Sequence, residues 1–219
     1  MKLNSLRRTM LDALLIENQN VFKGRVIDVG GKKVNARGLQ IPHPKDVTCW
    51  ESLNIDKNTN PDYLCSAENI PVNSESFDVA VMCEVLEHLE NPEKVLDEIT
   101  RVLKNHGKIV LSVPFLWGYH ADPYDFQRWT QVKIKMVLTE RGFSTIDIQP
   151  MGGIGSVIYD LFLIQLKKTR QLVVSKIGLR LLLVLKPILL FLDRVASFDK
   201  ELVTTGFFVI ATKNTQPDK

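Results

Sequence analysis

Three apolar runs, at residues 25–29, 77–83 and 109–113, constrain the fold of this chain most strongly. The second run shows no polar alternation after Asp78, which is typical of a parallel strand that helices cover on both faces. Between the second and third runs, apolar residues recur at helical spacing from Val95 to Leu103. This order of strand, helix and strand predicts an α/β fold with a mainly parallel sheet.

Four weaker strand patterns complete the predicted sheet, at residues 47–55, 62–65, 144–149 and 205–212. A helix is expected after Asn91, its candidate cap, and a second one after Thr130. We therefore expect a Rossmann-like sheet of seven strands with helices on both faces, in a single domain over residues 1–219.

The N-terminal residues 1–20 are apolar but interrupted by charges, so they lack the continuous apolar core of a signal peptide. They predict an amphipathic helix with one apolar face, formed by Leu3, Leu6, Met10, Ala13 and Leu14. Such a helix would cover one side of the sheet, with a lid over a ligand as the alternative. A cytoplasmic location is expected.

Composition narrows the class of protein. The formal net charge is +3, with 24% charged and 45% hydrophobic residues, which favours an ordinary globular protein and gives no indication of nucleic-acid binding. Cys49, Cys65 and Cys83 form no C-x-x-C pair and no metal-type spacing with the four histidines. The sequence therefore predicts a reducing compartment and no metal site.

Residues 152–199, before the last strand, are a predicted helical insertion of unusual composition. Their apolar core at residues 181–192 is shorter than the roughly 20 residues that span a bilayer, and Lys186-Pro187 interrupts it. Residues 161–192 hold six basic residues and no acidic ones. We expect burial in the fold or in a homodimer interface, with peripheral contact to the inner face of an anionic membrane as the alternative.

The segment Asp28-Val29-Gly30-Gly31 follows the first strand. A glycine turn there lets the backbone approach a ligand closely, and an acid at the strand end can bind a ligand ammonium. A plain strand-to-helix turn is the alternative. Neither the dinucleotide fingerprint G-x-G-x-x-G nor a P-loop is present.

Five segments in order resemble class I S-adenosylmethionine-dependent methyltransferases, above all the small bacterial-type enzymes with an E-V-L-E-H-L segment. They are residues 26–31, 53–56, 65–71, 77–89 and 98–107. The resemblance implies S-adenosylmethionine as cofactor. Asp28, Gly30 and Gly31 would hold its methionine end, and Cys83 and Glu84 would line the methyl-donor pocket.

The same resemblance implies contacts to the nucleoside. The ribose would be held by Asn54, which its register favours, or by Asp56, whose carboxylate accepts two hydroxyl hydrogen bonds more readily than an amide does. Ser66, Ala67 and Glu68 would border the adenine.

The acceptor side is expected at residues 120–130, after the fifth strand, because loops at strand ends hold substrates in such sheets. His120 is the candidate general base, with a structural or substrate-contact role as the alternative. Tyr124, Asp125 and Arg128 are candidate substrate contacts, although the last two could pair and fix the loop instead. His88 is expected to pack at a helix end.

These features predict a methyltransferase that methylates an oxygen atom of a sugar, a glycan precursor or a small metabolite. The aromatic residues around the loop, Trp117, Tyr119, Tyr124 and Trp129, could stack on a sugar ring. The alternative is a non-catalytic binding or scaffold protein, because Lys32 and Ser66 replace a glycine and an aspartate that are common in the family.

Overall fold

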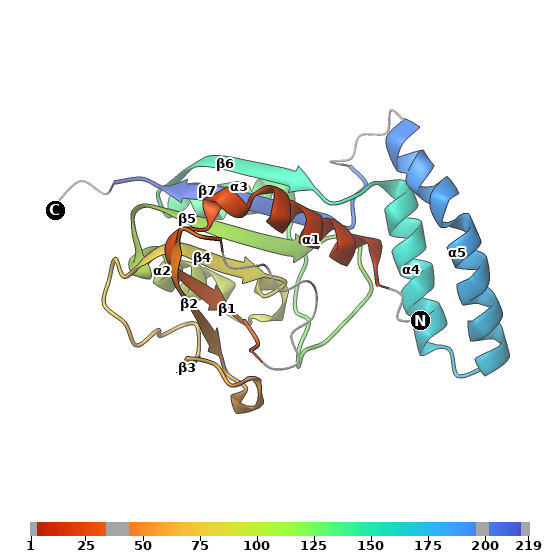
Figure 1. The fold of residues 1–219 in the computed structure, drawn as a ribbon, viewed down its shortest axis with the longest axis horizontal. Coiled ribbons are helices and arrows are strands. Elements are labelled where there is room, and N and C mark those ends of the chain that lie inside the picture. The colour runs from red at the N-terminus through yellow and green to blue at the C-terminus, as the bar shows by residue number, and fades with distance from the viewer. Residues whose placement is uncertain (1–3, 34–43, 196–201, 216–219) are drawn as a thin grey trace.

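The computed structural model describes residues 4–33, 44–195 and 202–215. A seven-stranded sheet with the order β3-β2-β1-β4-β5-β7-β6 forms its centre (Figure 1). The strands are β1 (Gly24–Val29), β2 (Val47–Asn54), β3 (Tyr63–Leu64), β4 (Phe77–Cys83), β5 (Leu103–Pro114), β6 (Phe143–Pro150) and β7 (Gly206–Lys213). Only β7 runs antiparallel to its neighbours, so the predicted fold class is confirmed.

Helices connect most of these strands. The α-helices are α1 (Leu6–Glu17), α2 (Pro92–Val102), α3 (Gln131–Glu140), α4 (Ile154–Lys168) and α5 (Leu172–Val195). Short 3-10 helices are η1 (Gln19–Val21), η2 (Lys57–Thr59) and η3 (Leu86–His88).

The two faces of the sheet carry separate cores because successive strand residues point to opposite sides. Ile27 and Ala80 belong to the face that α2 and α3 cover. Val26 and Val79 belong to the other face, where they pack with Leu11 of α1. Figure 1 shows α1 lying across that side of β5 and β7. Covering both faces explains the uninterrupted apolar runs in the sequence.

The buried face of α1 differs from the predicted one. Leu6, Leu11 and Leu15 are buried, whereas Met10 and Leu14 are only half-buried and Ala13 is exposed. Leu3 lies outside the described residues. The buried side also includes Arg7 and Asp12, two charged residues that an apolar periodicity excludes from the face. Polar contacts described below hold Arg7 there.

Two predicted boundaries around α2 also change. The strand β5 begins at Leu103, directly after the helix, because Leu103 pairs with Phe77 before the register shifts. Gly107 consequently lies within the strand and does not end a turn. Asn91 makes no side-chain cap; its amide group donates to Glu68 instead.

The helices α4 and α5 form a hairpin between β6 and β7, at the end of the molecule toward which β5 points (Figure 1). They pack closely, since a Cβ atom on Gly155 would lie 1.9 Å from the Leu189 carbonyl oxygen. The Asp160 carboxylate of α4 accepts hydrogen bonds from the backbone N–H groups of Leu6 and Arg7, at 2.7 and 2.9 Å. The hairpin is thereby fixed to the start of α1.

The outer side of this hairpin is apolar and exposed, which contradicts the expected burial within the fold. The exposed residues are Ile158, Leu161, Phe162, Val173, Val174, Ile177, Leu181, Val184, Leu185, Ile188, Phe191 and Leu192. Within the described ranges, no helix has the length and apolarity required to cross a bilayer.

Candidate functional site

The carboxyl ends of β1, β2 and β4 meet at one edge of the sheet. Asp28 of β1 stands opposite Ser52 of β2 and Val81 of β4. The glycine turn after β1 therefore emerges beside the chain that leaves β4. Parallel strands place such exits together, and ligands of open α/β sheets bind outside them.

The glycine turn touches the segment after β4. Gly30 has φ +77°, and a Cβ atom there would lie 2.8 Å from a Val85 methyl carbon. The Gly30 N–H donates to the Leu53 carbonyl at 2.8 Å. At Gly31, a Cβ atom would lie 2.6 Å from the Asp28 carboxyl carbon. Both glycines are therefore required by the packing of the turn.

Asn54 holds this turn in place. Its side-chain amide donates to the carbonyl oxygens of Gly30 and Gly31, each at 3.1 Å, and its side-chain oxygen accepts from the Asp56 N–H at 2.9 Å. The polar atoms of this buried side chain are thus engaged within the protein. Asp56 is exposed, and its carboxylate accepts from the Asn58 N–H. Asn54 therefore positions the glycine turn, whereas the Asp56 carboxylate lies at the exposed surface of the same edge.

The Asp28 carboxyl group is half-buried and, within the part of the chain that the structure describes, has one weak polar contact. The Trp50 indole donates to it at 3.4 Å. Removal from water raises its pKa to about 6, because burial disfavours the charged form. A cationic ligand group placed beside this carboxylate would stabilise its charged form.

The predicted adenine loop begins at the same edge, since the Cys65 N–H donates to the Asn54 carbonyl at 3.2 Å. Ala67 is buried in the core. Ser66 is exposed, and its hydroxyl accepts from the Glu68 N–H at 3.2 Å. These residues keep their predicted role as candidates.

Cys83 and Glu84 lie where β4 ends, and Cys83 pairs with Ser112 of β5. Burial raises the pKa of the Cys83 thiol to about 12, so it is neutral near pH 7. Glu84 has φ +60°, an uncommon conformation outside glycine. Its carboxylate accepts from the Ser112 hydroxyl at 2.9 Å and forms an ion pair with Arg7.

The Arg7 side chain comes from α1 and is buried beside this edge. Its guanidinium lies 4.1 Å from the centre of the Trp117 ring, a cation–π contact. Burial lowers its pKa to about 10, so it remains charged near pH 7. The Glu84 carboxylate is therefore neutralised by the protein's own helix.

In the loop after β5, Asp125 and Arg128 pair with each other. The Asp125 carboxylate accepts from both terminal nitrogens of Arg128 and from the His120 N–H at 2.9 Å. The hydrogen bond from Arg128 holds the pKa of Asp125 well below its usual range, despite burial that acts in the opposite direction. This pair fixes the loop, as the alternative interpretation required, whereas Tyr124 is exposed.

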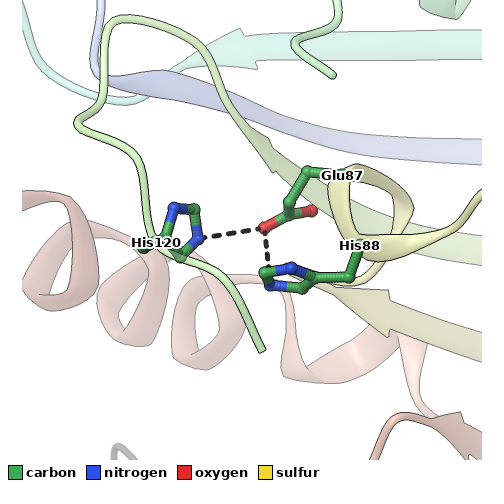
Figure 2. Close-up of side chains that lie close together, drawn as sticks. All are labelled: Glu87, His88 and His120. Carbon is green, nitrogen blue, oxygen red and sulfur yellow. Dashed lines mark ion pairs between the residues drawn. The ribbon is translucent and has the colours of Figure 1, made fainter. Parts of the chain in front are cut away.

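The loop brings His120 to the η3 helix, beside Glu87 and His88 (Figure 2). The Nε2 atoms of both histidines lie 3.6 Å from the same Glu87 carboxylate oxygen. Glu87 is completely buried, and neither of its carboxylate oxygens has a hydrogen-bond partner among the described residues. The two imidazole rings meet edge to face, with centroids 5.1 Å apart.

The sequence interpretation missed this cluster. The adjacent Glu87-His88 pair was a signal, but its partner His120 lies 33 positions beyond Glu87. It also misplaced two aromatic residues: Trp129 is buried in the core, and Trp117 is covered by Arg7. Tyr119, Tyr124 and Phe126 are exposed rings of the loop.

Comparisons with known proteins agree with this architecture. Residues 42–111 match a family model described as a methyltransferase domain. An uncharacterized protein of Methanocaldococcus jannaschii is 30% identical over 96 residues, which are 43% of this chain and 47% of that protein. The match therefore spans about half the length of this relative.

Solved structures share the fold. A SAM-dependent methyltransferase from Archaeoglobus fulgidus has a TM-score of 0.57 at 16% identity, covering 94% of each chain. The [4+2]-cyclase SpnF has a TM-score of 0.60 at 15% identity, covering 94% of this chain and 80% of the other. Phosphoethanolamine N-methyltransferase 2 of Haemonchus contortus, in complex with S-adenosyl-L-methionine, has a TM-score of 0.53 at 12% identity. That match covers 94% of this chain and 52% of the other.

The strand order and these structures show the fold of class I S-adenosylmethionine-dependent methyltransferases, and residues 42–111 match the methyltransferase-domain model. S-adenosylmethionine is the cofactor that such a domain would bind. The residues at the sheet edge fit that cofactor. The turn at Gly30 and Gly31 has no side chains, so its backbone can approach a ligand closely. The half-buried Asp28 carboxyl suits the ammonium group of the cofactor's methionine end.

Proposed function

We propose that this chain methylates an oxygen atom of a small-molecule acceptor, with sugars and glycan precursors as the first candidates. The observation that carries the proposal is the cluster of Glu87, His88 and His120 beside the methyl-donor edge. Val85 touches the glycine turn, and Glu87 follows it by two positions. An acceptor at the cluster would therefore face the donor.

When bound, S-adenosylmethionine supplies an electrophilic methyl group on a sulfonium sulfur. Asp28 would hold its ammonium, Asp56 its ribose hydroxyls, and Ser66 with Glu68 its adenine. Cys83 would border the donor methyl group as a neutral thiol. Because the donor is already activated, alignment of the two reacting atoms accounts for most of the rate, and such positioning lowers barriers by about 7–11 kcal/mol.

The acceptor hydroxyl must lose its proton, and His120 is placed to assist. Its Nδ1 lies 3.3 Å from the Gly118 carbonyl and 3.5 Å from the Asp125 carboxylate, both of which accept hydrogen bonds. Nδ1 therefore carries the proton of the neutral ring, and Nε2 keeps an electron pair. That pair can accept the hydroxyl proton or hold a cation that acidifies the hydroxyl. The exposed Tyr119 and Tyr124 rings offer stacking surfaces to a sugar.

The test is transfer of a labelled methyl group from the donor to a panel of sugar nucleotides, lipid-linked sugars and extracted metabolites. His120→Ala should abolish transfer while S-adenosylhomocysteine affinity, measured by isothermal titration calorimetry, stays within about twofold. The control is His106→Asn, which removes an exposed imidazole in β5 and keeps a residue that tolerates its φ of +61°. Unchanged transfer by His120→Ala would remove His120 from the mechanism.

A non-catalytic scaffold is the competing hypothesis, motivated by Lys32 and Ser66. Lys32 does not obstruct the turn, because its ammonium points to the Asp122 carboxylate at 3.5 Å. Absence of binding of both S-adenosylmethionine and S-adenosylhomocysteine at millimolar concentration would favour the scaffold.

We further infer that the α4–α5 hairpin contacts an anionic membrane surface. Its outer apolar side is exposed, and residues 161–192 carry six basic and no acidic residues. Acidic headgroups would attract that charge, whereas an apolar homodimer would bring two such basic surfaces together. The Lys168 ammonium of α4 lies 3.5 Å from the Tyr119 carbonyl, so the hairpin borders the acceptor loop. This placement suits an acceptor held at a lipid surface.

A further inference from the structure

We propose that Glu87, His88 and His120 form a binding site for a divalent cation of the Zn²⁺ type. The three side chains each offer one ligand atom, and these atoms all lie within 4.8 Å of one another. Two imidazole nitrogens and one carboxylate oxygen are a donor set that zinc uses when a further position stays open. The inference rests on the proposed methyl transfer, and it makes His120 a ligand.

The orientation of the rings supports the site. The Nδ1 atom of His88 lies 2.6 Å from the Tyr124 carbonyl oxygen, which can only accept a hydrogen bond. The Nδ1 atom of His120 faces the Gly118 carbonyl in the same way. In both neutral rings Nε2 therefore has a free electron pair, directed at the carboxylate of Glu87. Electron pairs that converge in this way repel one another unless a proton or a metal cation lies between them.

The Glu87 carboxylate adds a second, independent observation. It is completely buried, and neither oxygen has a hydrogen-bond partner among the described residues. A buried carboxylate without a partner is costly, and native structures pair such groups or coordinate them to a metal. Arg7 and Arg128 attract the Glu87 charge without a hydrogen bond to it, because Arg7 pairs with Glu84 and Arg128 with Asp125.

The distances are close to those of a filled site. Zinc bonds to nitrogen and oxygen ligands of about 2.0–2.1 Å place neighbouring ligand atoms about 3.4 Å apart in a tetrahedron. Each Nε2 lies 3.6 Å from the Glu87 oxygen, and the three ligand atoms lie within 4.8 Å of one another, so the two imidazoles would move closer together around a bound cation.

Outer contacts hold the ligands as metal sites require. The Nδ1–H group of each histidine donates a hydrogen bond to a backbone carbonyl oxygen, which fixes the orientation of the ring and its tautomer. The Phe126 N–H donates to the Glu87 carbonyl at 2.8 Å, which ties the loop to η3. The cluster is thus assembled before any cation arrives.

The cation would bind the acceptor oxygen and increase the acidity of its hydroxyl group. The His120 side chain is 31% exposed, so the cluster opens toward solvent on that side. An acceptor hydroxyl that binds the cation loses its proton to water more readily, since metal-bound oxygen is more acidic. The resulting alkoxide forms the new O–C bond as the donor's C–S bond breaks, and the electron pair of that bond remains on sulfur.

The test begins with protein freed of metal by a chelator and dialysed. Titration with ZnCl₂ should show one tight site per chain, and CoCl₂ should give the visible absorption of tetrahedral cobalt bound to nitrogen and oxygen. Glu87→Gln and His88→Ala should each weaken zinc binding by about 100-fold or more, exceeding the usual loss for a supporting contact. His106→Asn should bind zinc as the wild type does. S-adenosylhomocysteine affinity, unchanged in every variant, verifies folding.

Two results would overturn the inference. The first is zinc binding that persists in the Glu87→Gln/His88→Ala double variant, which would mean adventitious binding elsewhere, for example at the exposed Cys49. The second is chelated protein that binds no cobalt and transfers methyl groups at the full rate. In that second case the proposed methyl transfer stands and only the metal site fails, so the two hypotheses remain distinguishable.

Discussion

The Arg7 guanidinium on α1 forms an ion pair with the Glu84 carboxylate at the end of β4. The two side chains are only 9% and 17% exposed, so neither charge is well hydrated. The pair joins the N-terminal helix to the edge of the sheet where the donor is expected. It also explains why a charged residue lies on the buried side of α1.

Removing one partner of this pair should destabilise the protein strongly. Arg7→Met leaves the Glu84 charge without compensation, and breaking a buried pair costs about 3–5 kcal/mol. We expect urea unfolding to show a loss of unfolding free energy near the lower end of this range, about 3 kcal/mol, because the Ser112 hydroxyl still donates to Glu84. The double variant Arg7→Met/Glu84→Gln should recover part of that loss. A change below about 1 kcal/mol in the single variant would contradict a structural role for the pair.

Asp28 should make the free protein less stable as the pH rises. Its pKa is raised to about 6 in the folded state, above the ordinary value near 4, so the folded protein binds this proton more tightly than the unfolded chain. Its favourable contribution is complete below pH 4 and is lost through pH 6. Asp28→Asn, which cannot ionise, should match the wild type at pH 4 and exceed it by about 2–3 kcal/mol at pH 7.5.

The same Asp28→Asn variant should lose at least about tenfold in affinity for S-adenosylhomocysteine, because a charge-assisted contact becomes a neutral one. Denaturation curves at both pH values and calorimetric titration check the two effects together. Asp160, whose pKa burial also raises to about 6, is present in both proteins and cancels in the comparison. Equal stability of the two proteins at every pH would show that Asp28 is well hydrated.

Asn54 and Asp56 should respond differently to substitution. Asn54→Ala leaves the Gly30 and Gly31 carbonyls without their donor, so it should lower both stability and ligand affinity. Asp56→Asn keeps a side-chain oxygen for the Asn58 N–H and should leave stability unchanged while weakening S-adenosylhomocysteine binding about tenfold. Thermal melts and calorimetry separate these outcomes. If the Asp56→Asn variant binds S-adenosylhomocysteine with full affinity, Asn54 would be the residue that binds the ribose hydroxyls.

The hairpin should bind anionic vesicles. We expect the protein to co-sediment with vesicles that contain phosphatidylglycerol, but not with pure phosphatidylcholine, and to be released by salt. Phe162→Ser/Ile177→Ser and Lys176→Gln/Arg180→Gln should each reduce binding. The control is Val132→Ser, which changes an exposed apolar residue on α3. Protein that stays in the supernatant at low salt, or a dimer that Phe162→Ser dissociates, would support the homodimer alternative.

The sheet was predictable because its signals are local. The apolar runs before Gly30 and after Asp78 mark strands covered on both faces, and handed crossovers then limit the strand order. Asp28 and Gly30 could be placed at the edge for the same reason. The Glu87–His120 contact could not, because it depends on how the loop after β5 folds back onto η3 through contacts distant in sequence, such as the hydrogen bond from the Phe126 N–H to the Glu87 carbonyl.

Arg7 escaped prediction for a different reason. Periodicity assigns apolar side chains to the inside of a helix, but a charged side chain is buried only where a partner exists. That partner, Glu84, is distant in sequence and occupies an uncommon backbone conformation. The expected burial of the outer side of the hairpin was wrong for the opposite reason. Apolar periodicity indicates that a helix face is buried, but it does not identify the surface that covers the face.

The α4–α5 hairpin leaves the sheet and returns to it at neighbouring positions. Pro150 at the end of β6 is paired with Phe207 near the start of β7. The register between β6 and β7 therefore does not depend on the number of residues between Pro150 and Phe207. A descendant of this chain could exchange the hairpin for a different cap while its nucleoside edge stayed intact. If the hairpin takes part in acceptor binding as proposed, a change of acceptor would require no change at the sheet edge.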